Sequence, residues 1–198
     1  MDFFAFTFQP HAMKILSLKE TTAFVADGEQ RNPGAWVNHS LFVAKAAEVI
    51  ALERPSLDHQ TAFILRYLHD IGRREGITQN RQILDGFNFL TNQGYDDAAR
   101  VCLTHWLPVK NVQTVMGLWG QCTTADIEFI QGYLDQIEYN AYDKLIQLCD
   151  ALALPSGYCL IENRFVDVAL LHVINAYTVP RWRLIWTFKM NLKRHYLL

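Results

Sequence analysis

A histidine and an aspartate are adjacent at His69 and Asp70, where the apolar segment 62–71 runs into a glycine. Burying either polar side chain costs free energy unless another group neutralises it. A metal ion would neutralise both, because imidazole nitrogen and carboxylate oxygen are common metal ligands. Adjacent residues of a helix point about 100° apart, so the remaining ligands of such an ion must come from other helices.

Two distant residues can supply those ligands. His39 lies upstream and shares a helical face with Val43, Ala46 and Ile50, which turns it inward. Asp150 lies downstream on a strongly apolar helix, where an unpaired carboxylate would be costly or would have to be protonated. Two alternatives stay open at this point. His39 could be a core histidine satisfied by a backbone carbonyl, and Asp150 could pair with a buried arginine or lysine.

The chemistry of this residue set favours phosphoryl transfer to water. Two imidazoles and two carboxylates without a thiolate suit a borderline-to-hard divalent ion, such as Mn, Fe, Co, Ni, Zn or Mg. Such an ion lowers the pKa of water and polarises a phosphoryl oxygen, which promotes hydrolysis of a phosphate ester or anhydride.

The ordered set of His39, His69, Asp70 and Asp150 resembles the H…HD…D pattern of the HD-domain metal-dependent phosphohydrolases. The resemblance covers residues 33–157, and the Ile-Gly after Asp70 gives the HDIG form that many members carry. It implies an all-α, single-domain HD-type helical bundle in which these four residues bind one divalent metal ion. It also implies a small nucleotide substrate, such as a nucleoside monophosphate, a deoxynucleoside triphosphate, a dinucleoside polyphosphate or a signalling nucleotide.

Three residues are expected to act on the substrate. Asp70 would both bind the ion and orient the attacking water, while Arg73 and His105 would stabilise the charge that develops on the phosphoryl group. His105 matches an accessory histidine of relatives that hold two metals, and a basic residue follows the HDIG motif in many relatives. Arg73 could instead form a solvated basic corner, and His105 could interact only with the last carbonyls of its helix.

One accessory position departs from the family pattern. Where two-metal relatives often have a first extra histidine, this chain has Gln82 and Asp85. The departure favours a mononuclear site and keeps two other functions open. One is a non-catalytic module that binds a nucleotide or another ligand at a degenerate HD site, and the other is an HD-type iron oxidase, which would need a second set of ligands.

The composition is that of one globular domain, with 198 residues of which 51% are hydrophobic. A net charge of −2 and a pI near 6.4 provide no basic field for long nucleic acid. The four cysteines show no CxxC spacing, which favours a reduced, cytoplasmic protein. No apolar run is long enough for a transmembrane segment. The expected partner is a small phosphorylated substrate, and a homodimer is left open.

Capping residues and apolar spacing predict roughly eight to nine helices. Ser17 and Glu20 are expected to form a capping box at the first helix. Ser56 and Thr124 are expected to cap the helices that follow them, and Pro180 is expected to break the last helix of the domain. We expect a disordered extension at 1–12, the HD domain at 13–180, and a basic aromatic C-terminal helix at 181–198 packed on the domain. The predicted helices of the domain cover residues 18–28, 32–53, 57–70, 82–93, 95–106, 125–136, 142–154 and 161–176.

Three segments are less clearly assigned. Residues 109–121 lack periodicity and could form either a loop that covers the cleft or an irregular connector. Asp143 and Lys144 are expected on the solvated surface of the helix that carries Asp150. The 181–198 helix could bind a membrane surface or a polyanion, although packing of its aromatic side chains on the domain is the favoured interpretation.

Overall fold

The protein is described by a computed structural model at residues 13–115, 117–171 and 174–194. Within these residues the chain forms nine α-helices and one two-stranded antiparallel sheet, so the all-α prediction is confirmed. The extension predicted at 1–12 lies outside the described residues. No helix in the described part of the chain combines the length and the apolar character needed to cross a membrane.

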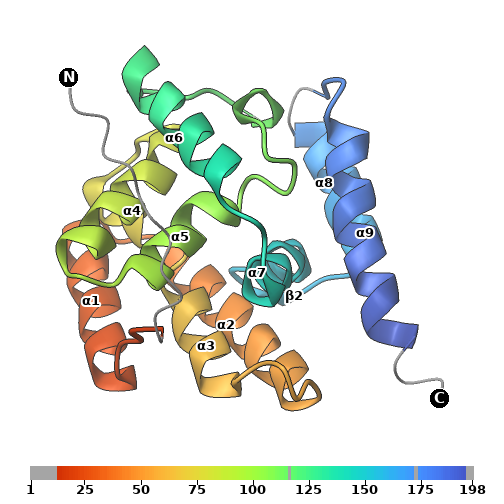
Figure 1. The fold of residues 1–198 in the computed structure, drawn as a ribbon, viewed down its shortest axis with the longest axis horizontal. Coiled ribbons are helices and arrows are strands. Elements are labelled where there is room, and N and C mark those ends of the chain that lie inside the picture. The colour runs from red at the N-terminus through yellow and green to blue at the C-terminus, as the bar shows by residue number, and fades with distance from the viewer. Residues whose placement is uncertain (1–12, 116, 172–173, 195–198) are drawn as a thin grey trace.

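The first five helices pack together on one side of the molecule (Figure 1). Their buried faces form the main hydrophobic core, in which Val43, Leu68, Leu90 and Leu103 are fully buried. The helices and the two 3-10 helices between them are α1 (Leu18–Arg31), α2 (Trp36–Leu52), α3 (His59–Tyr67), η1 (Ile71–Glu75), η2 (Gln79–Arg81), α4 (Gln82–Asn92) and α5 (Asp96–Thr104).

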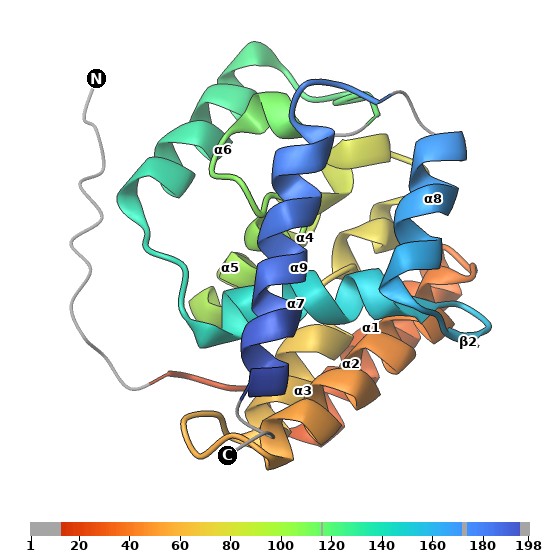
Figure 2. The same ribbon diagram turned by 90° about the vertical axis from the view of Figure 1, so that its right-hand side faces the viewer.

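The second half of the chain adds a central helix and a C-terminal pair. Helix α7 lies between the first five helices and the pair formed by α8 and α9, which faces the viewer in Figure 2. In chain order the elements are η3 (Val112–Thr114), α6 (Thr124–Gln136), α7 (Ala141–Leu152), β1 (Ala153–Leu154), β2 (Gly157–Tyr158), α8 (Ile161–Leu171) and α9 (Thr178–Arg194).

Two of the predicted capping residues are wrong by one or two positions. Helix α3 is capped by Asp58, whose carboxylate accepts a hydrogen bond from the Thr61 amide at 2.6 Å, and not by Ser56. Helix α6 is capped by Thr123 in a capping box with Asp126. The box predicted at Ser17 is present. Neighbouring Ser, Thr and Asp residues can all cap, so the sequence alone does not separate them.

Asn32, predicted to begin the second helix, instead ends α1. Its backbone N–H donates to the Gly28 carbonyl at 3.0 Å, and its side-chain amide donates to the Arg73 carbonyl at 2.6 Å. This long-range bond holds the start of α2 against η1, and α2 therefore begins only at Trp36.

The helix predicted at 57–70 is shorter than expected. It ends at Tyr67, and the turn 68–70 carries His69 and Asp70 before η1 begins at Ile71. The two side chains therefore leave a turn rather than a regular helix. Both are buried, His69 completely.

Gly72 explains how this turn is held. A Cβ atom at Gly72 would lie 1.9 Å from the Gln82 carbonyl oxygen and 2.4 Å from the Gly86 amide nitrogen of α4. Only a residue without a side chain allows η1 to approach α4 this closely. Asp70 lies two residues before Gly72 and Arg73 directly after it, so the close contact also fixes the position of these two residues.

The C-terminal pair is attached through a small apolar cluster of its own. Within the described residues this cluster has four buried members, Leu148 and Ala151 from α7, Ile161 from α8 and Ile185 from α9. Helix α8 is shorter than the predicted 161–176. Pro180 was predicted to break that helix but lies in the first turn of α9. Backbone N–H groups in the first turn have no partner within the helix, so the missing N–H of proline costs no hydrogen bond there.

Candidate metal centre

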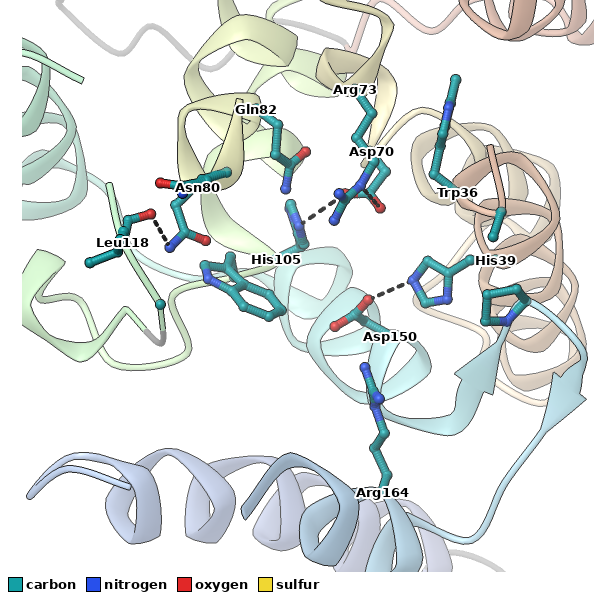
Figure 3. Close-up of a pocket in the computed structure, with 15 residues that line it drawn as sticks. Trp36, His39, Asp70, Arg73, Asn80, Gln82, His105, Leu118, Asp150 and Arg164 are labelled. Atoms are coloured by element: carbon teal, nitrogen blue, oxygen red, sulfur yellow. Dashed lines mark hydrogen bonds and ion pairs between the residues drawn. The ribbon is translucent and has the colours of Figure 1, made fainter. Parts of the chain in front are cut away.

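Three elements bring the predicted metal ligands together. His39 comes from α2, His69 and Asp70 from the turn after α3, and Asp150 from α7. Ligand atoms of His39, His69 and Asp70 all lie within 4.8 Å of one another, so this cluster could hold a metal ion. The Asp150 carboxylate is 3.0 Å from His39 Nε2 and 3.6 Å from His69 Nε2 (Figure 3 shows the His39 contact).

A backbone carbonyl orients the His69 ring. Its Nδ1 lies 2.6 Å from the Arg66 carbonyl oxygen, so Nδ1–H donates there and the lone pair is left on Nε2. His69 Nε2 and Asp70 Oδ1 are both buried, and neither has a hydrogen-bond partner among the described residues. Two buried ligand atoms without partners are what a cation site requires, because each would otherwise cost free energy.

Charged neighbours keep both carboxylates ionised. Burial alone would raise the pKa of Asp70, but the Arg73 guanidinium and the surrounding imidazoles lower this pKa well below its usual range. Burial likewise opposes ionisation of Asp150, while the hydrogen bond from His39 and the nearby His69 imidazole hold the pKa of Asp150 well below the ordinary value.

Arg73 and His105, the two residues expected to stabilise charge on the phosphoryl group, both lie beside Asp70. Arg73 Nε donates to Asp70 Oδ2 at 2.7 Å, so this arginine is paired with Asp70 although its side chain is 44% exposed. His105 Nε2 is 3.7 Å from Asp70 Oδ1, and its Nδ1 lies 3.2 Å from the Val101 carbonyl oxygen. Burial, with the nearby His69, lowers the pKa of His105 to about 4, so its ring is neutral near pH 7.

A cavity of about 550 Å³ opens beside these residues. The size suits a small organic ligand. It is lined by His39, Asp70, Arg73, His105 and Asp150, together with Trp36, Trp106, Leu118 and Arg164 among others. Leu118 comes from the segment predicted either as a loop over the cleft or as a connector, and that segment does line the cavity.

Gln82 and Asp85, the residues found where two-metal relatives often have an extra histidine, lie in two different places. Gln82 lines the cavity, and its buried Oε1 has no hydrogen-bond partner in the described chain. Asp85 instead pairs with Arg81 at 3.2 Å and lies away from this cavity. Gln82 can thus face a ligand, whereas Asp85 does not join the candidate centre.

The expectation of a solvated Asp143 is wrong. Asp143 is 1% exposed, accepts hydrogen bonds from Arg100 and Thr104, and also serves in the capping box of α7. Lys144 is exposed as expected. The local sequence around Asp143 does not show that its side chain is buried. Only the packing of α5 against α7 brings Arg100 close enough to pair with Asp143.

Several cavity residues were not predicted, among them Trp36, Trp106 and Arg164. Trp36 lies one helical turn before His39 on α2, and Trp106 directly follows His105, so a search for aromatic neighbours of the ligands would have found both. Trp106 is backed by Arg181, whose guanidinium carbon lies 4.5 Å from the ring centroid. Arg164 had no sequence signal, because a single arginine on a helix is common on any surface.

Comparison of the chain with protein-family models, curated proteins and solved structures gave no match. The resemblance to the HD-domain phosphohydrolases therefore rests on the motif residues themselves.

Proposed function

We propose that this protein is a metal-dependent phosphohydrolase of the HD type that cleaves a phosphate ester or anhydride of a small molecule, most simply a nucleotide. One observation carries the proposal. His39, His69, Asp70 and Asp150 come from three separate parts of the sequence and approach one another, and His39, Asp70 and Asp150 line a ligand-sized cavity.

The four residues fit a divalent ion. Imidazole Nε2 atoms and carboxylate oxygens form the donor set, and two of these atoms, His69 Nε2 and Asp70 Oδ1, are buried without a partner. The carbonyl behind His69 fixes its tautomer, as is usual for a metal-bound histidine. When bound, a divalent ion supplies Lewis acidity, which lowers the pKa of water and polarises a phosphoryl oxygen.

The remaining groups would bind and orient the reactants. Asp70 accepts a hydrogen bond from Arg73 through one oxygen, and its second oxygen is free to orient a water molecule or to bind the ion. Arg73 is tethered beside the centre, where its other N–H groups can donate to phosphate oxygens. The His105 ring, held by the Val101 carbonyl, presents Nε2 toward the same place and can position water or a phosphate oxygen.

The test is the effect of Asp70→Asn on metal binding and on metal-stimulated phosphate release from a panel of nucleotides and simple phosphate esters. We expect the wild-type protein to bind about one divalent ion per chain and to release phosphate from at least one panel member. The Asn variant should lose activity by about 10³-fold or more, because it removes both a ligand and the charge beside the reacting water.

Asp85→Asn is the matched control, since Asp85 is also a partly buried aspartate paired with an arginine but lies outside the cavity. It should retain activity. A wild-type protein that binds no divalent ion would contradict the proposal. Stoichiometric metal and substrate binding without turnover would instead support the non-catalytic binding module, for which Gln82 in place of a histidine is the favouring observation.

A further inference from the structure

Arg164 is a cavity residue from outside the family motif. It lies near the start of α8, beyond residues 33–157, and its side chain extends toward Asp150 (Figure 3). The side chain is half-buried, and its guanidinium makes no hydrogen bond or ion pair with any other described residue. By contrast, Arg73, Arg81 and Arg100 each pair with an aspartate.

The charges on the cavity wall show how Arg164 contributes to the binding of an anion. The charged lining residues are two acids, Asp70 and Asp150, and two bases, Arg73 and Arg164, so with neutral histidines the wall has no net charge. A bound divalent ion would raise the total to +2. A phosphate group carries a charge of about −1.5 to −2 near pH 7 and would neutralise this wall. Without Arg164 the total would be only +1.

The position of Arg164 complements that of Arg73. Arg73 lies beside Asp70, with one N–H already donated to that carboxylate, whereas Arg164 approaches the cluster from the side of Asp150. Two guanidinium groups on the two sides of a metal cluster can each donate to different oxygens of one tetrahedral anion. A buried arginine behind the wall, Arg181, adds further positive potential without reaching the cavity.

We propose that Arg164 is a phosphate-binding residue of this site, which holds oxygens of the same phosphoryl group that lies over the metal cluster. The proposal rests on the phosphohydrolase function inferred above and adds to it a residue on the C-terminal helical pair. Recognition of the phosphate then depends on two parts of the fold, the turn after α3 and the helix α8.

The experiment measures binding of inorganic phosphate to the full chain by calorimetry, with Mn²⁺ present and again with the metal removed by a chelator. Binding of Mn²⁺ alone is measured on the same samples. We expect Arg164→Ala to weaken phosphate binding to the Mn²⁺-loaded protein by about 10-fold or more, as for loss of a charge-assisted hydrogen bond. Its Mn²⁺ affinity should stay within about threefold of wild type.

Two further variants sharpen the result. Arg164→Lys keeps the charge but loses the planar pair of donors, so it should fall between wild type and Arg164→Ala. Arg183→Ala removes an exposed arginine on α9 that does not line the cavity, and it should bind phosphate as wild type does. Circular dichroism of each variant confirms that the helices are intact.

The outcomes separate this inference from the proposed function. If Arg164→Ala binds phosphate as tightly as wild type, the role of Arg164 is wrong while metal-dependent hydrolysis can still stand. If the wild type binds no Mn²⁺ yet binds phosphate through Arg164, the anion site is correct and the metal-dependent function is not.

Discussion

At the scale of single residues, the ligand cluster depends on groups that hold the histidine rings in place. The Arg66 and Val101 carbonyls lie 2.6 and 3.2 Å from Nδ1 of His69 and His105, so both rings direct Nε2 toward Asp70. The ligand types were predictable because polar residues inside apolar segments require compensation. The carbonyls that orient them were not, since every residue has one and only the fold selects which is near.

The structure predicts different roles for His69 and His105, whose rings are neighbours. His105 lies outside the group His39, His69 and Asp70, so we expect His105→Gln to leave the metal affinity within about threefold of wild type. Activity should fall by about 10- to 10³-fold, as is typical for loss of a group that stabilises charge on the substrate. Metal titration and steady-state kinetics measure the two effects separately.

An exposed histidine provides the control for this variant. His59 at the start of α3 is exposed, lies 3.8 Å from Glu48 and does not line the cavity, so His59→Gln should change neither quantity. A loss of metal binding in His105→Gln equal to its loss of activity would identify His105 as a ligand instead.

At the scale of elements, the candidate centre depends on the contact between η1 and α4. The helix predicted at 57–70 included His69 and Asp70, because its apolar spacing gives no sign of the turn that carries them. After the turn, η1 packs so closely on α4 at Gly72 that a Cβ there would overlap the Gln82 carbonyl, and this tertiary contact is not visible in the local sequence. The presence of the helices could thus be predicted from the local pattern, whereas the residue at which a helix ends could not be predicted where that end packs against another element.

Substitution of Gly72 tests this contact. A Cβ at Gly72 would overlap the Gln82 carbonyl, and because backbone cannot move aside as a side chain can, Gly72→Ala should destabilise the fold by about 3 kcal/mol or more. Gly132→Ala is the matched control, since Gly132 lies within α6 with no atom near the added methyl group. It should stabilise by about 0.5–1 kcal/mol. Chemical denaturation measures both, and equal effects would contradict the account.

The cap of α3 predicts a dependence of stability on pH. Hydrogen bonds from Thr61 lower the pKa of Asp58, so its stabilising contribution is present above the unfolded pKa of about 3.9 and is lost as the pH falls through the lower folded value. Asp58→Ala should lose about 1 kcal/mol at neutral pH. Asp58→Asn keeps an acceptor, so it should lose less and should show a smaller decrease in stability between pH 5 and 2. An unchanged pH profile in Asp58→Asn would refute this role.

At the scale of the whole molecule, the protein has two apolar clusters of unequal size. The main core joins α1 to α7, whereas the C-terminal pair is held by four buried apolar residues. Val166, Leu170 and Leu171 of α8 remain exposed. The sequence predicted one domain with a packed C-terminal helix, but it could not show that α8 would form part of the cavity wall, because that depends on how the pair lies across α7.

The unequal clusters predict unequal local stability. Amides of α8 and α9 should exchange with solvent at least about 10-fold faster than those of α4 and α5, because opening of the pair exposes much less buried apolar surface than opening of the main core. Hydrogen exchange read by mass spectrometry measures this, and the difference should vanish near the denaturation midpoint. Equal protection in all four helices would show that the molecule opens only as a whole.

The separate attachment of the C-terminal pair has a consequence for how such a protein can change over generations. The candidate ion ligands belong to elements of the main core, while Arg164 belongs to α8. Substitutions in α8 that alter the preferred ligand would leave the packing around His39, His69 and Asp70 unchanged, because α8 packs mainly on α7. Preference for a substrate and retention of the ion can therefore be inherited as nearly independent traits.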